Sequence, residues 1–230
     1  MNPVIIDTAV DITAALPALK ASGVKTVIGY MSSINPTGAK CLNPLRIKAI
    51  AARGMKVGLV HEGWGGVDGK GITAEDGIRD GSYCRAKASL LGAPKGACIY
   101  FACDKDFSSA EITNLVLPYF RAIRQQFADG FYRVGVYGSG KVCQTVMDYG
   151  LANLSWLAQS KGWTAYSTWL AKASDVQGAQ TKLDGVEVDS DVAQGDIGDF
   201  VPVFADETPK DAPAPVPVAA KQSWFQRWFG

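Results

Sequence analysis

Acidic side chains stand at the ends of several apolar segments of this 230-residue sequence, and they are the groups best placed to do acid–base chemistry. Asp7, Glu62, Asp104 and Asp189 each follow a mostly apolar run, and Asp106 comes two positions after Asp104. A carboxylate at the end of a buried segment is costly unless it is paired or hydrogen-bonded. Such a set suits glycosidic bond cleavage, in which one protonated carboxyl donates to the leaving oxygen and an ionised one attacks, stabilises or activates water.

The single histidine, His61, limits other kinds of catalysis. Zinc hydrolases with two or three histidine ligands are excluded, and any histidine-dependent triad must use this residue. His61 directly precedes Glu62 and could orient or tune that carboxyl, although a packed histidine at a strand end would look the same. We expect neither a metal ion nor an organic cofactor.

Aromatic, amide and further polar side chains near these positions are candidates for binding a sugar. Flat aromatic faces suit sugar rings, but ordinary core packing would explain several of them equally well. The candidates for substrate binding are Tyr30, His61, Trp64, Tyr137, Gln159, Trp169 and Asp191.

The composition is that of one globular domain without a preference for a polyanionic partner. Hydrophobic residues make up 47% of the chain, and 23 Lys and Arg nearly balance 22 Asp and Glu. Single α/β barrels have this length, and a net charge of +1 gives no reason to expect nucleic-acid binding. We expect a monomer.

The cysteines and the N-terminal residues predict a cytoplasmic protein. The five cysteines form no CxxC pair, and Cys98 and Cys103 lie in an apolar run where free cysteine acts as a small hydrophobe. This usage indicates a reducing compartment. The first residues lack the basic and apolar regions of a signal peptide, and no segment approaches the roughly 18 apolar residues of a membrane span.

Short apolar runs alternate with helical segments up to about residue 204, and several of these runs are typical of strands buried on both faces. Eight strands with interleaved helices, some of them shortened after the fifth strand, favour a (β/α)8 barrel of the TIM type; a doubly wound open sheet is the alternative. Working residues would lie at the carboxyl ends of the strands. The expected strands are Val4–Asp7, Thr26–Tyr30, Lys56–Glu62, Ala97–Asp104, Tyr132–Tyr137, Leu154–Gln159, Ala165–Leu170 and Gly185–Asp189.

Helix boundaries are marked by local signals. Helices over Ala14–Ser22 and Pro44–Arg53 are each followed by glycine, the residue expected at a helix C-terminus. Two more helices begin at Thr73 and Ser108 with the spacing of capping boxes.

The composition changes after the barrel segment, residues 1–204. Residues 205–220 contain four of the eleven prolines and predict a semi-rigid extended linker. In residues 221–230, Trp224, Phe225, Trp228 and Phe229 would share one face of a helix, next to Lys221 and Arg227. Such an amphipathic tail either contacts a bacterial membrane surface, or folds back onto the barrel or frays.

A series of short motifs follows the order of the expected strands. They are Ile6-Asp7, Gly58-Leu-Val-His-Glu62, the helix 76–92 leading into Gly-Ala-Pro94, Tyr100-Phe-Ala-Cys-Asp-Lys-Asp106, Gly135-Val-Tyr-Gly138, Trp156-Leu-Ala and Val188-Asp-Ser-Asp191. Together they resemble the glycoside hydrolase-like domain of the DUF1906 (Rv2525c-like) family, a relative of the family 25 glycoside hydrolases, the Chalaropsis-type lysozymes. The resemblance covers residues 3–203.

The resemblance implies a (β/α)8-like barrel, a peptidoglycan or related glycan substrate, and a carboxylate site at Asp7, Asp104, Asp106 and Asp189. The sequence departs from the lysozymes at position 106, where Asp replaces the acid Glu. Either Asp106 still serves as the acid, or Glu62 takes over, or the site is degenerate and only binds glycan.

The leading hypothesis is therefore a muramidase-like glycosidase of the endolysin kind, made in the host cytoplasm and released to the cell wall. The alternatives are a non-catalytic glycan-binding module and, more weakly, an exported effector. Two competing motifs carry little weight: the phosphate-loop pattern over residues 135–142 has Val142 where Ser or Thr would hold Mg²⁺. A Cys103–His61 dyad competes with a simpler explanation from the neighbouring carboxylates.

Overall fold

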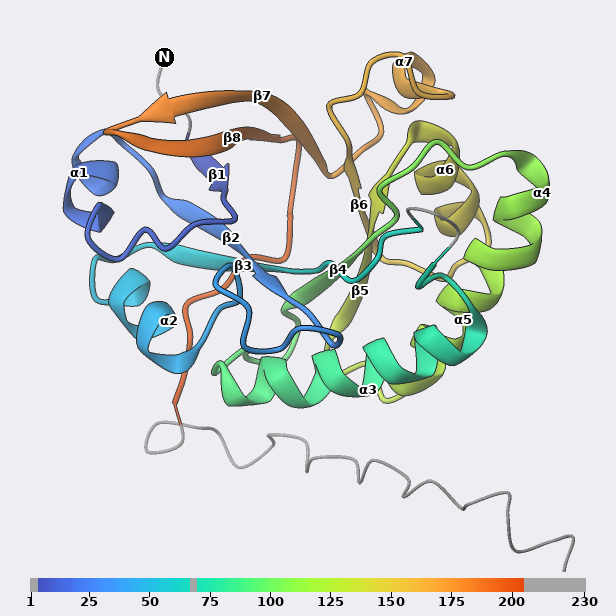
Figure 1. The fold of residues 1–230 in the computed structure, drawn as a ribbon, viewed down its shortest axis with the longest axis horizontal. Helices are drawn as coiled ribbons and strands as arrows, with labels where there is room; N and C mark the ends of the chain where they lie inside the picture. The colour runs from blue at the N-terminus through green and yellow to red at the C-terminus, as the bar shows by residue number, and fades with distance from the viewer. Residues whose placement is uncertain (1–3, 67–69, 205–230) are drawn as a thin grey trace, which may run out of the picture.

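The apolar runs of the sequence form the strands of a closed barrel, described over residues 4–66 and 70–204 in a computed structural model (Figure 1). Each strand pairs with its neighbours in sequence, and the last pairs with the first. The strands are β1 (Ile5–Asp7), β2 (Thr26–Met31), β3 (Lys56–His61), β4 (Cys98–Ala102), β5 (Arg133–Gly138), β6 (Leu154–Leu157), β7 (Asp175–Leu183) and β8 (Val186–Ala193). The expected barrel architecture is confirmed.

Helices cover the outside of the barrel between most strands (Figure 1). They are α1 (Leu16–Ala21), α2 (Pro44–Ala51), α3 (Ala74–Leu90), α4 (Ser109–Glu111), α5 (Leu117–Gln126), α6 (Gly140–Asp148) and α7 (Tyr166–Trp169), with a π-helical turn (Ile112–Val116) joining α4 to α5. Both expected capping boxes are present, at Thr73 and at Ser108. Of the helices after β5, α7 is shortened to four residues, and β7 leads into β8 through a two-residue turn.

The direction of β8 departs from that of an all-parallel barrel. Strands β1 to β7 run parallel, whereas β8 is antiparallel to both β7 and β1. Asp184 and Gly185 form the β7–β8 turn with φ of 51° and 85°, the backbone region that a tight hairpin requires. As a result, Asp189 lies in the middle of β8, opposite Asp7 of β1, rather than at the carboxyl end of a parallel strand.

The expected seventh strand, Ala165–Leu170, is wrong. Ala165 has a left-handed backbone (φ 62°) and precedes the short helix α7, in which Trp169 packs inward and donates from Nε1 to Ser155 Oγ at 3.0 Å. The seventh strand is β7 instead. Its sequence is mostly polar and contains a glycine and a bulge between Gln177 and Gln180, so it lacks the apolar signal of a buried strand.

Side chains on successive strand residues alternate between the barrel interior and the helix layer. The interior holds Ile5, Ile28, Val60, Cys98, Tyr100, Ala102, Trp156 and Ile197, and a larger apolar cluster lies between barrel and helices. The segment after β8 closes the end of the barrel at which the parallel strands begin: Tyr100 donates to the Ile197 carbonyl at 3.0 Å, and Phe200 bridges to Val57. The other end, where the parallel strands finish, stays open.

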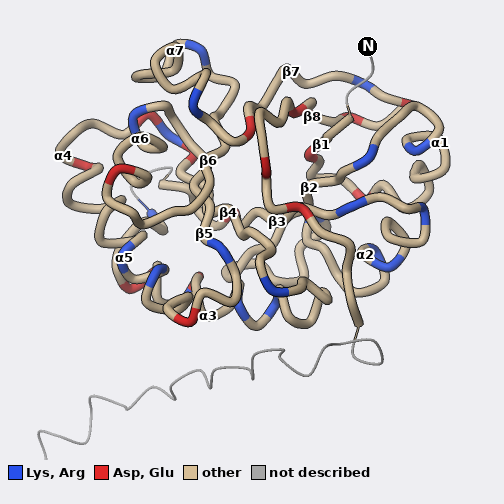
Figure 2. The backbone as a smooth tube through the Cα atoms, turned by 180° about the vertical axis from the view of Figure 1, so that it is seen from behind, with Lys and Arg blue, Asp and Glu red and all other residues tan. Residues whose placement is uncertain are grey.

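The surface of the described residues is mixed in charge, with Lys and Arg interspersed among Asp and Glu (Figure 2). None of the described helices is long and apolar enough to span a bilayer. Residues 205–220 and 221–230, the expected linker and amphipathic tail, lie outside the described residues, so their roles remain predictions.

Gly198 provides a test of how the barrel end is closed. Its φ is +74°, and a Cβ there would lie 2.2 Å from Cys98 Cβ. Gly198→Ala should lower the free energy of unfolding by about 3 kcal/mol, since backbone strain and overpacking add. Gly96→Ala is the matched control, because Gly96 has a φ of +89° with open space around it; we expect a loss of about 1 kcal/mol. Equal losses in urea denaturation would contradict the close packing of this segment.

Candidate functional site

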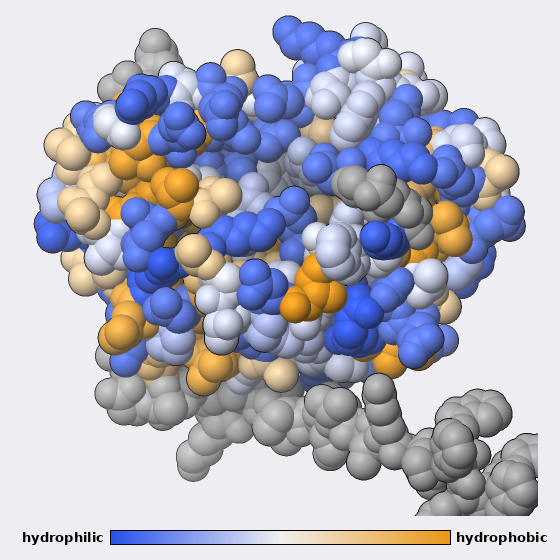
Figure 3. All heavy atoms as spheres, viewed as in Figure 1, coloured by the Kyte–Doolittle hydropathy of each residue, from blue (hydrophilic) through white to orange (hydrophobic). Residues whose placement is uncertain are grey.

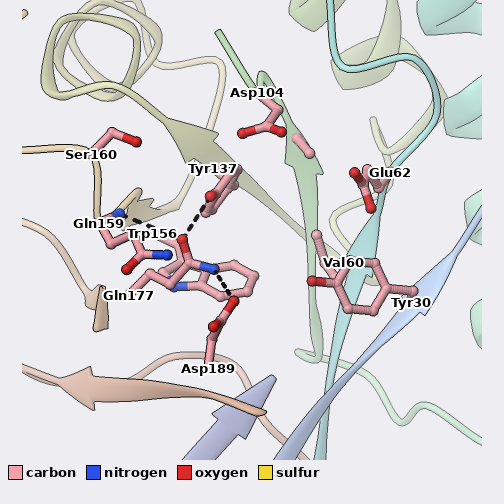
Figure 4. Close-up of a pocket in the computed structure, with 11 residues that line it drawn as sticks. Tyr30, Val60, Glu62, Asp104, Tyr137, Trp156, Gln159, Ser160, Gln177 and Asp189 are labelled. Atoms are coloured by element: carbon pink, nitrogen blue, oxygen red, sulfur yellow. Dashed lines mark hydrogen bonds between the residues drawn. The ribbon is translucent and has the colours of Figure 1, made fainter. Parts of the chain in front are cut away.

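A polar pocket of about 270 Å³ lies at the open end of the barrel. Its walls come from seven strands, β2 to β8, and the residues just after them, because inward-facing positions converge there. Figure 4 shows Glu62 and Asp104 on one side of the pocket and Asp189 on the opposite side. The lining residues are Tyr30, Val60, Glu62, Ala102, Asp104, Tyr137, Trp156, Gln159, Ser160, Gln177 and Asp189.

Glu62 and Asp104 form the acidic wall of the pocket. Glu62 accepts a hydrogen bond of 2.5 Å from Lys40 Nζ. Asp104 is open to the pocket, and its backbone N–H donates to the Gly65 carbonyl at 2.8 Å, which fixes the turn after β4. Partial desolvation raises the pKa of Asp104, and the nearby Glu62 charge raises it further, against a smaller lowering by Lys40. The two carboxyl groups therefore differ in environment.

Gln177 connects the side chains of the opposite wall. Its amide N donates to Asp7 Oδ2 and to Asp189 Oδ2, both at 3.3 Å, and its carbonyl O accepts from Tyr137 Oη at 2.8 Å. Tyr30 Oη donates to Asp7 Oδ1 at 2.6 Å. Burial raises the pKa of Asp7 to about 6, even though the Tyr30 hydrogen bond opposes this shift.

Two further aspartates lie beneath the pocket, inside the barrel. Asp191 accepts from Trp156 Nε1 at 3.0 Å, so it holds the indole that lines the pocket. Asp175 is fully buried, and burial raises its pKa to about 7; burial also raises that of Asp191 well above its ordinary value. Each has a buried carboxylate oxygen without a hydrogen-bond partner. These groups hold protons far more strongly than exposed aspartates do.

Of the catalytic candidates, the structure brings Glu62, Asp104, Asp7 and Asp189 to this region, but it places Asp106 elsewhere. Both carboxylate oxygens of Asp106 accept from the Thr164 N–H at 3.1 Å, and Oδ2 also accepts from Thr164 Oγ1 at 2.9 Å. Asp106 does not line the pocket described above. It fastens the turn after β4 to the segment that leads into α7.

The structure places His61 behind the pocket wall. Because neighbouring residues of β3 point to opposite sides, Val60 faces the interior while His61 faces the helix layer. His61 Nε2 accepts from the Ser33 N–H at 3.2 Å and lies 3.8 Å from Asp80. Burial lowers the pKa of His61, which favours the neutral ring as acceptor. It therefore supports the strand from which Glu62 extends.

The remaining substrate-binding candidates separate into two groups. Tyr30, Tyr137 and Gln159 line the pocket, whereas Trp169 is buried against Ser155 and Asp191 lies below the pocket floor. Trp64 does not line the pocket, but it is 51% exposed on the loop whose Gly65 contacts Asp104. The described residues contain no group of three or more His, Cys, Asp or Glu arranged to hold a metal ion.

Sequence reasoning missed Lys40, Gln177 and Asp175. Lys40 lies in the loop between β2 and α2, where no motif marks it, and the other two lie on the strand that was not recognised. Trp156 occurs in the motif Trp156-Leu-Ala, but the motif alone does not mark it as a residue of the site. The phosphate-loop pattern is not free for a ligand at its helix end, because the Ser139 side chain accepts from the Val142 N–H.

Comparison with known proteins gives a consistent family assignment. A family model described as "Rv2525c-like, glycoside hydrolase-like domain" matches residues 17–199. YbfG of Bacillus subtilis, of uncharacterized function, is 32% identical over 66% of this chain and 22% of its own length. The B. subtilis protein FadG, also uncharacterized, is 27% identical over 77% of this chain and 33% of its own length. The chain thus spans between a fifth and a third of these two relatives.

A mycobacterial relative has both a sequence match and a solved structure. Rv2525c of Mycobacterium tuberculosis, provisionally named a peptidoglycan hydrolase, is 28% identical over 74% of this chain and 72% of its own length. Its crystal structure with L-tartrate has a TM-score of 0.72 and 21% identity, covering 86% of this chain and 98% of that one. At that identity the structural match shows the common fold.

The expected cytoplasmic location is wrong, because the structurally similar Rv2525c is a Tat-secreted protein. The inference rested partly on free cysteines, and the structure explains why they are a poor guide. All five thiols are buried, and burial raises the pKa of Cys98 and Cys103, so they are shielded from oxidants. Such cysteines give no information about the redox state of a compartment.

Asp175 provides a test of the charges inside the barrel. Its folded-state pKa of about 7 lies above the ordinary 3.8, so the folded state binds more protons between these values. The free energy of unfolding should therefore fall as the pH rises from about 4 to about 7. Asp175→Asn should remove on the order of 2–4 kcal/mol of this fall. Urea denaturation across this pH range measures the slope, with Asp148→Asn at an exposed site on α6 as control; identical slopes in wild type and Asp175→Asn would contradict the assignment.

Proposed function

The chain belongs to the Rv2525c-like, glycoside hydrolase-like domain family, and we propose that its pocket hydrolyses a glycosidic bond of a cell-wall glycan, with muramidase-type cleavage of peptidoglycan as the specific reaction. The observation that carries this proposal is the pair of unlike carboxyls on one pocket wall. Glu62 is ion-paired to Lys40, whereas the pKa of Asp104 is raised. A carboxyl with a raised pKa beside an ion-paired carboxylate is what acid–base cleavage of a glycosidic bond needs.

In this proposal Asp104 is the general acid. It is open to the pocket, and its raised pKa favours the protonated form that a general acid needs. Its proton passes to the glycosidic oxygen as the bond from that oxygen to the anomeric carbon breaks. This assignment replaces Asp106, whose oxygens bind Thr164.

Glu62 is the ionised partner. Its carboxylate either attacks the anomeric carbon or takes a proton from the attacking water, according to whether the reaction retains or inverts configuration. The positive charge that develops on the sugar ring is stabilised by the acidic surroundings of the pocket, which include Asp189. Tyr30 and Tyr137 present ring surface to the sugar from the walls.

The shape of the site supports a polymeric substrate. A second hollow of about 110 Å³ adjoins the pocket and shares Tyr30 and Asp189 with it, extending past Thr8 toward Glu187 and Gln180. A chain of sugars could thus continue beyond the pocket along β8. The sequence similarity to Rv2525c, which is provisionally named a peptidoglycan hydrolase, adds support for a peptidoglycan substrate. The phage endolysin context remains a prediction.

Replacement of the two carboxyls tests the reaction. Glu62→Gln and Asp104→Asn should each lower the release of new reducing ends from purified peptidoglycan by about 10²- to 10⁴-fold, because each removes an acid–base group. Circular dichroism should show an unchanged fold. Asp106→Asn should retain most of the activity; a loss as large as that of Asp104→Asn would return the acid role to Asp106.

Product analysis separates hydrolysis from binding alone. Wild-type protein that co-sediments with peptidoglycan without releasing reducing ends would overturn the proposed hydrolysis and favour the glycan-binding module.

Trp64 is a candidate for stacking on a sugar outside the pocket. It is exposed next to the acidic wall, with Lys70 Nζ 5.4 Å from its ring centroid. Trp64→Ala should raise KM for polymeric peptidoglycan several-fold, since aromatic stacking contributes about 1 kcal/mol, and should leave kcat nearly unchanged. Leu45→Ala, at an exposed apolar site on α2, is the control. An unchanged KM would remove Trp64 from the binding surface.

A further inference from the structure

Lys40 is the one cationic side chain among residues 4–66 and 70–204 that forms an ion pair with a carboxylate of the pocket. Its Nζ lies 2.5 Å from Glu62 Oε2 and 5.1 Å from the ring centroid of Tyr30. Lys40 itself is not one of the residues that line the pocket. It reaches Glu62 from the loop between β2 and α2, so it acts on the wall rather than on the space a substrate would fill.

The backbone on both sides of Lys40 is held by one arginine. Arg46 Nη1 donates to the Ala39 carbonyl at 2.5 Å and to the Cys41 carbonyl at 3.0 Å. Arg46 extends from α2, whose first turn is capped by the Asn43 side chain. A single guanidinium thus fixes the two carbonyls that flank the lysine.

Arg46 is fixed in turn by Asp11. Its Nε and Nη2 donate to Asp11 Oδ2 at 3.1 and 2.8 Å, while Asp11 Oδ1 accepts from the N–H and the hydroxyl of Thr13. Two N–H groups of one guanidinium meeting one carboxylate make a directional contact. Beyond Lys40, the Leu42 N–H donates to the Tyr30 carbonyl at 2.8 Å and ties the loop to β2.

We propose that Lys40 is a positioning residue for the acid–base pair assigned above, on which this inference rests. Its ammonium group fixes the Glu62 carboxylate in the pocket wall and places a positive charge beside Asp104, and Arg46 together with Asp11 holds the lysine there. The lysine side chain loses rotamer entropy on making this contact, and a loop that is not held in place would lose backbone entropy as well. Arg46 removes the second cost because it already fixes the backbone from which the side chain extends.

The charge of Lys40 has a consequence that position alone would not have. Asp104 is faced by Glu62 after β3, by Tyr137 on β5 and by Lys40; on its own segment, Lys105 pairs with Glu111 and Asp106 binds Thr164. Glu62 raises the pKa of Asp104, and Lys40 lowers it. Removal of the ammonium should therefore raise the pKa of Asp104 further, so that the acid stays protonated to higher pH.

Three variants at two lysines test the proposal in the full chain. In Lys40→Met, kcat for peptidoglycan hydrolysis should fall about 10- to 100-fold with little change in KM, because the wall carboxylate is displaced. The alkaline limb of the pH profile should move to higher pH, by on the order of half a pH unit. Lys40→Arg keeps the charge and should restore the position of that limb. Lys56→Met removes a lysine paired to Asp199 at 3.3 Å at the closed end of the barrel, and should change neither quantity.

Arg46→Met separates the effect of the held loop from the effect of the Lys40 charge. In this variant Lys40 remains but the loop that carries it is no longer held by Arg46, so kcat should fall while the alkaline limb moves less than in Lys40→Met. Lys40→Met with wild-type kcat and wild-type pH profile would overturn the proposal.

A second readout does not depend on activity. In protein labelled with ¹³C at aspartate carboxyls, the signal lost in Asp104→Asn identifies Asp104, and its titration should move to higher pH in Lys40→Met but not in Lys56→Met. An unmoved titration overturns the role of Lys40 even in an active enzyme. If the wild-type protein releases no reducing ends but the Asp104 titration still moves in Lys40→Met, the proposed hydrolysis is overturned and the electrostatic contact between Lys40 and Asp104 is established.

Discussion

The barrel interior has to accommodate four aspartates, and the rest of the site depends on how it does so. Asp7, Asp175, Asp189 and Asp191 face one another from β1, β7 and β8, and none of them forms an ion pair with a described Lys, Arg or His. The cost of burying such carboxylates is reduced by protonation and by hydrogen bonds from neutral donors. Tyr30, Gln177 and Trp156 supply those donors to Asp7, Asp189 and Asp191, whereas Asp175 accepts from the Val176 N–H. The same three side chains line the pocket, so residues of its wall stabilise aspartates of the barrel interior.

Glu62 and Asp104, at the open end of the barrel, have different interaction partners from the aspartates in its interior. Glu62 is ion-paired to Lys40, whereas burial and the Glu62 charge raise the pKa of Asp104, so the carboxyls that follow two neighbouring strands differ in their surroundings. The difference arises from the loop between β2 and α2, which carries Lys40 to the edge of the barrel.

Hydrophilic side chains cover much of the face seen in Figure 3, whereas apolar ones gather toward α1 and the β7–β8 hairpin. Electrostatics, rather than apolar enclosure, distinguishes this site.

The predictable parts of the molecule are those with a local signal. Apolar runs identified seven of the eight strands and the architecture, and glycine stops and capping boxes located helices to within a few residues. Strand β7 was not predicted because it forms one arm of the β7–β8 hairpin, which is partly open to solvent, so most of its residues are polar. The run at 165–170 resembles a strand in sequence but forms the helical turn α7.

Within the site, residues that end apolar strands could be found, since strand ends converge in a barrel. Their orientation could not be predicted so simply: a one-residue difference sends Val60 inward and His61 outward, and the turn after β4 brings Asp104 to the pocket and Asp106 to Thr164. Lys40 and Gln177 contact the site through long-range contacts that no spacing encodes.

The reversed direction of β8 also decides where the chain enters and leaves the barrel. Strand β1 begins at the closed end, and because β8 runs back toward it, Val203 reaches that same end, where its N–H donates to the Gly92 carbonyl. Both connections to neighbouring sequence therefore lie away from the pocket. A barrel connected in this way can form part of a longer polypeptide while its pocket stays accessible. The regions of YbfG and FadG that match this chain make up 22% and 33% of those proteins.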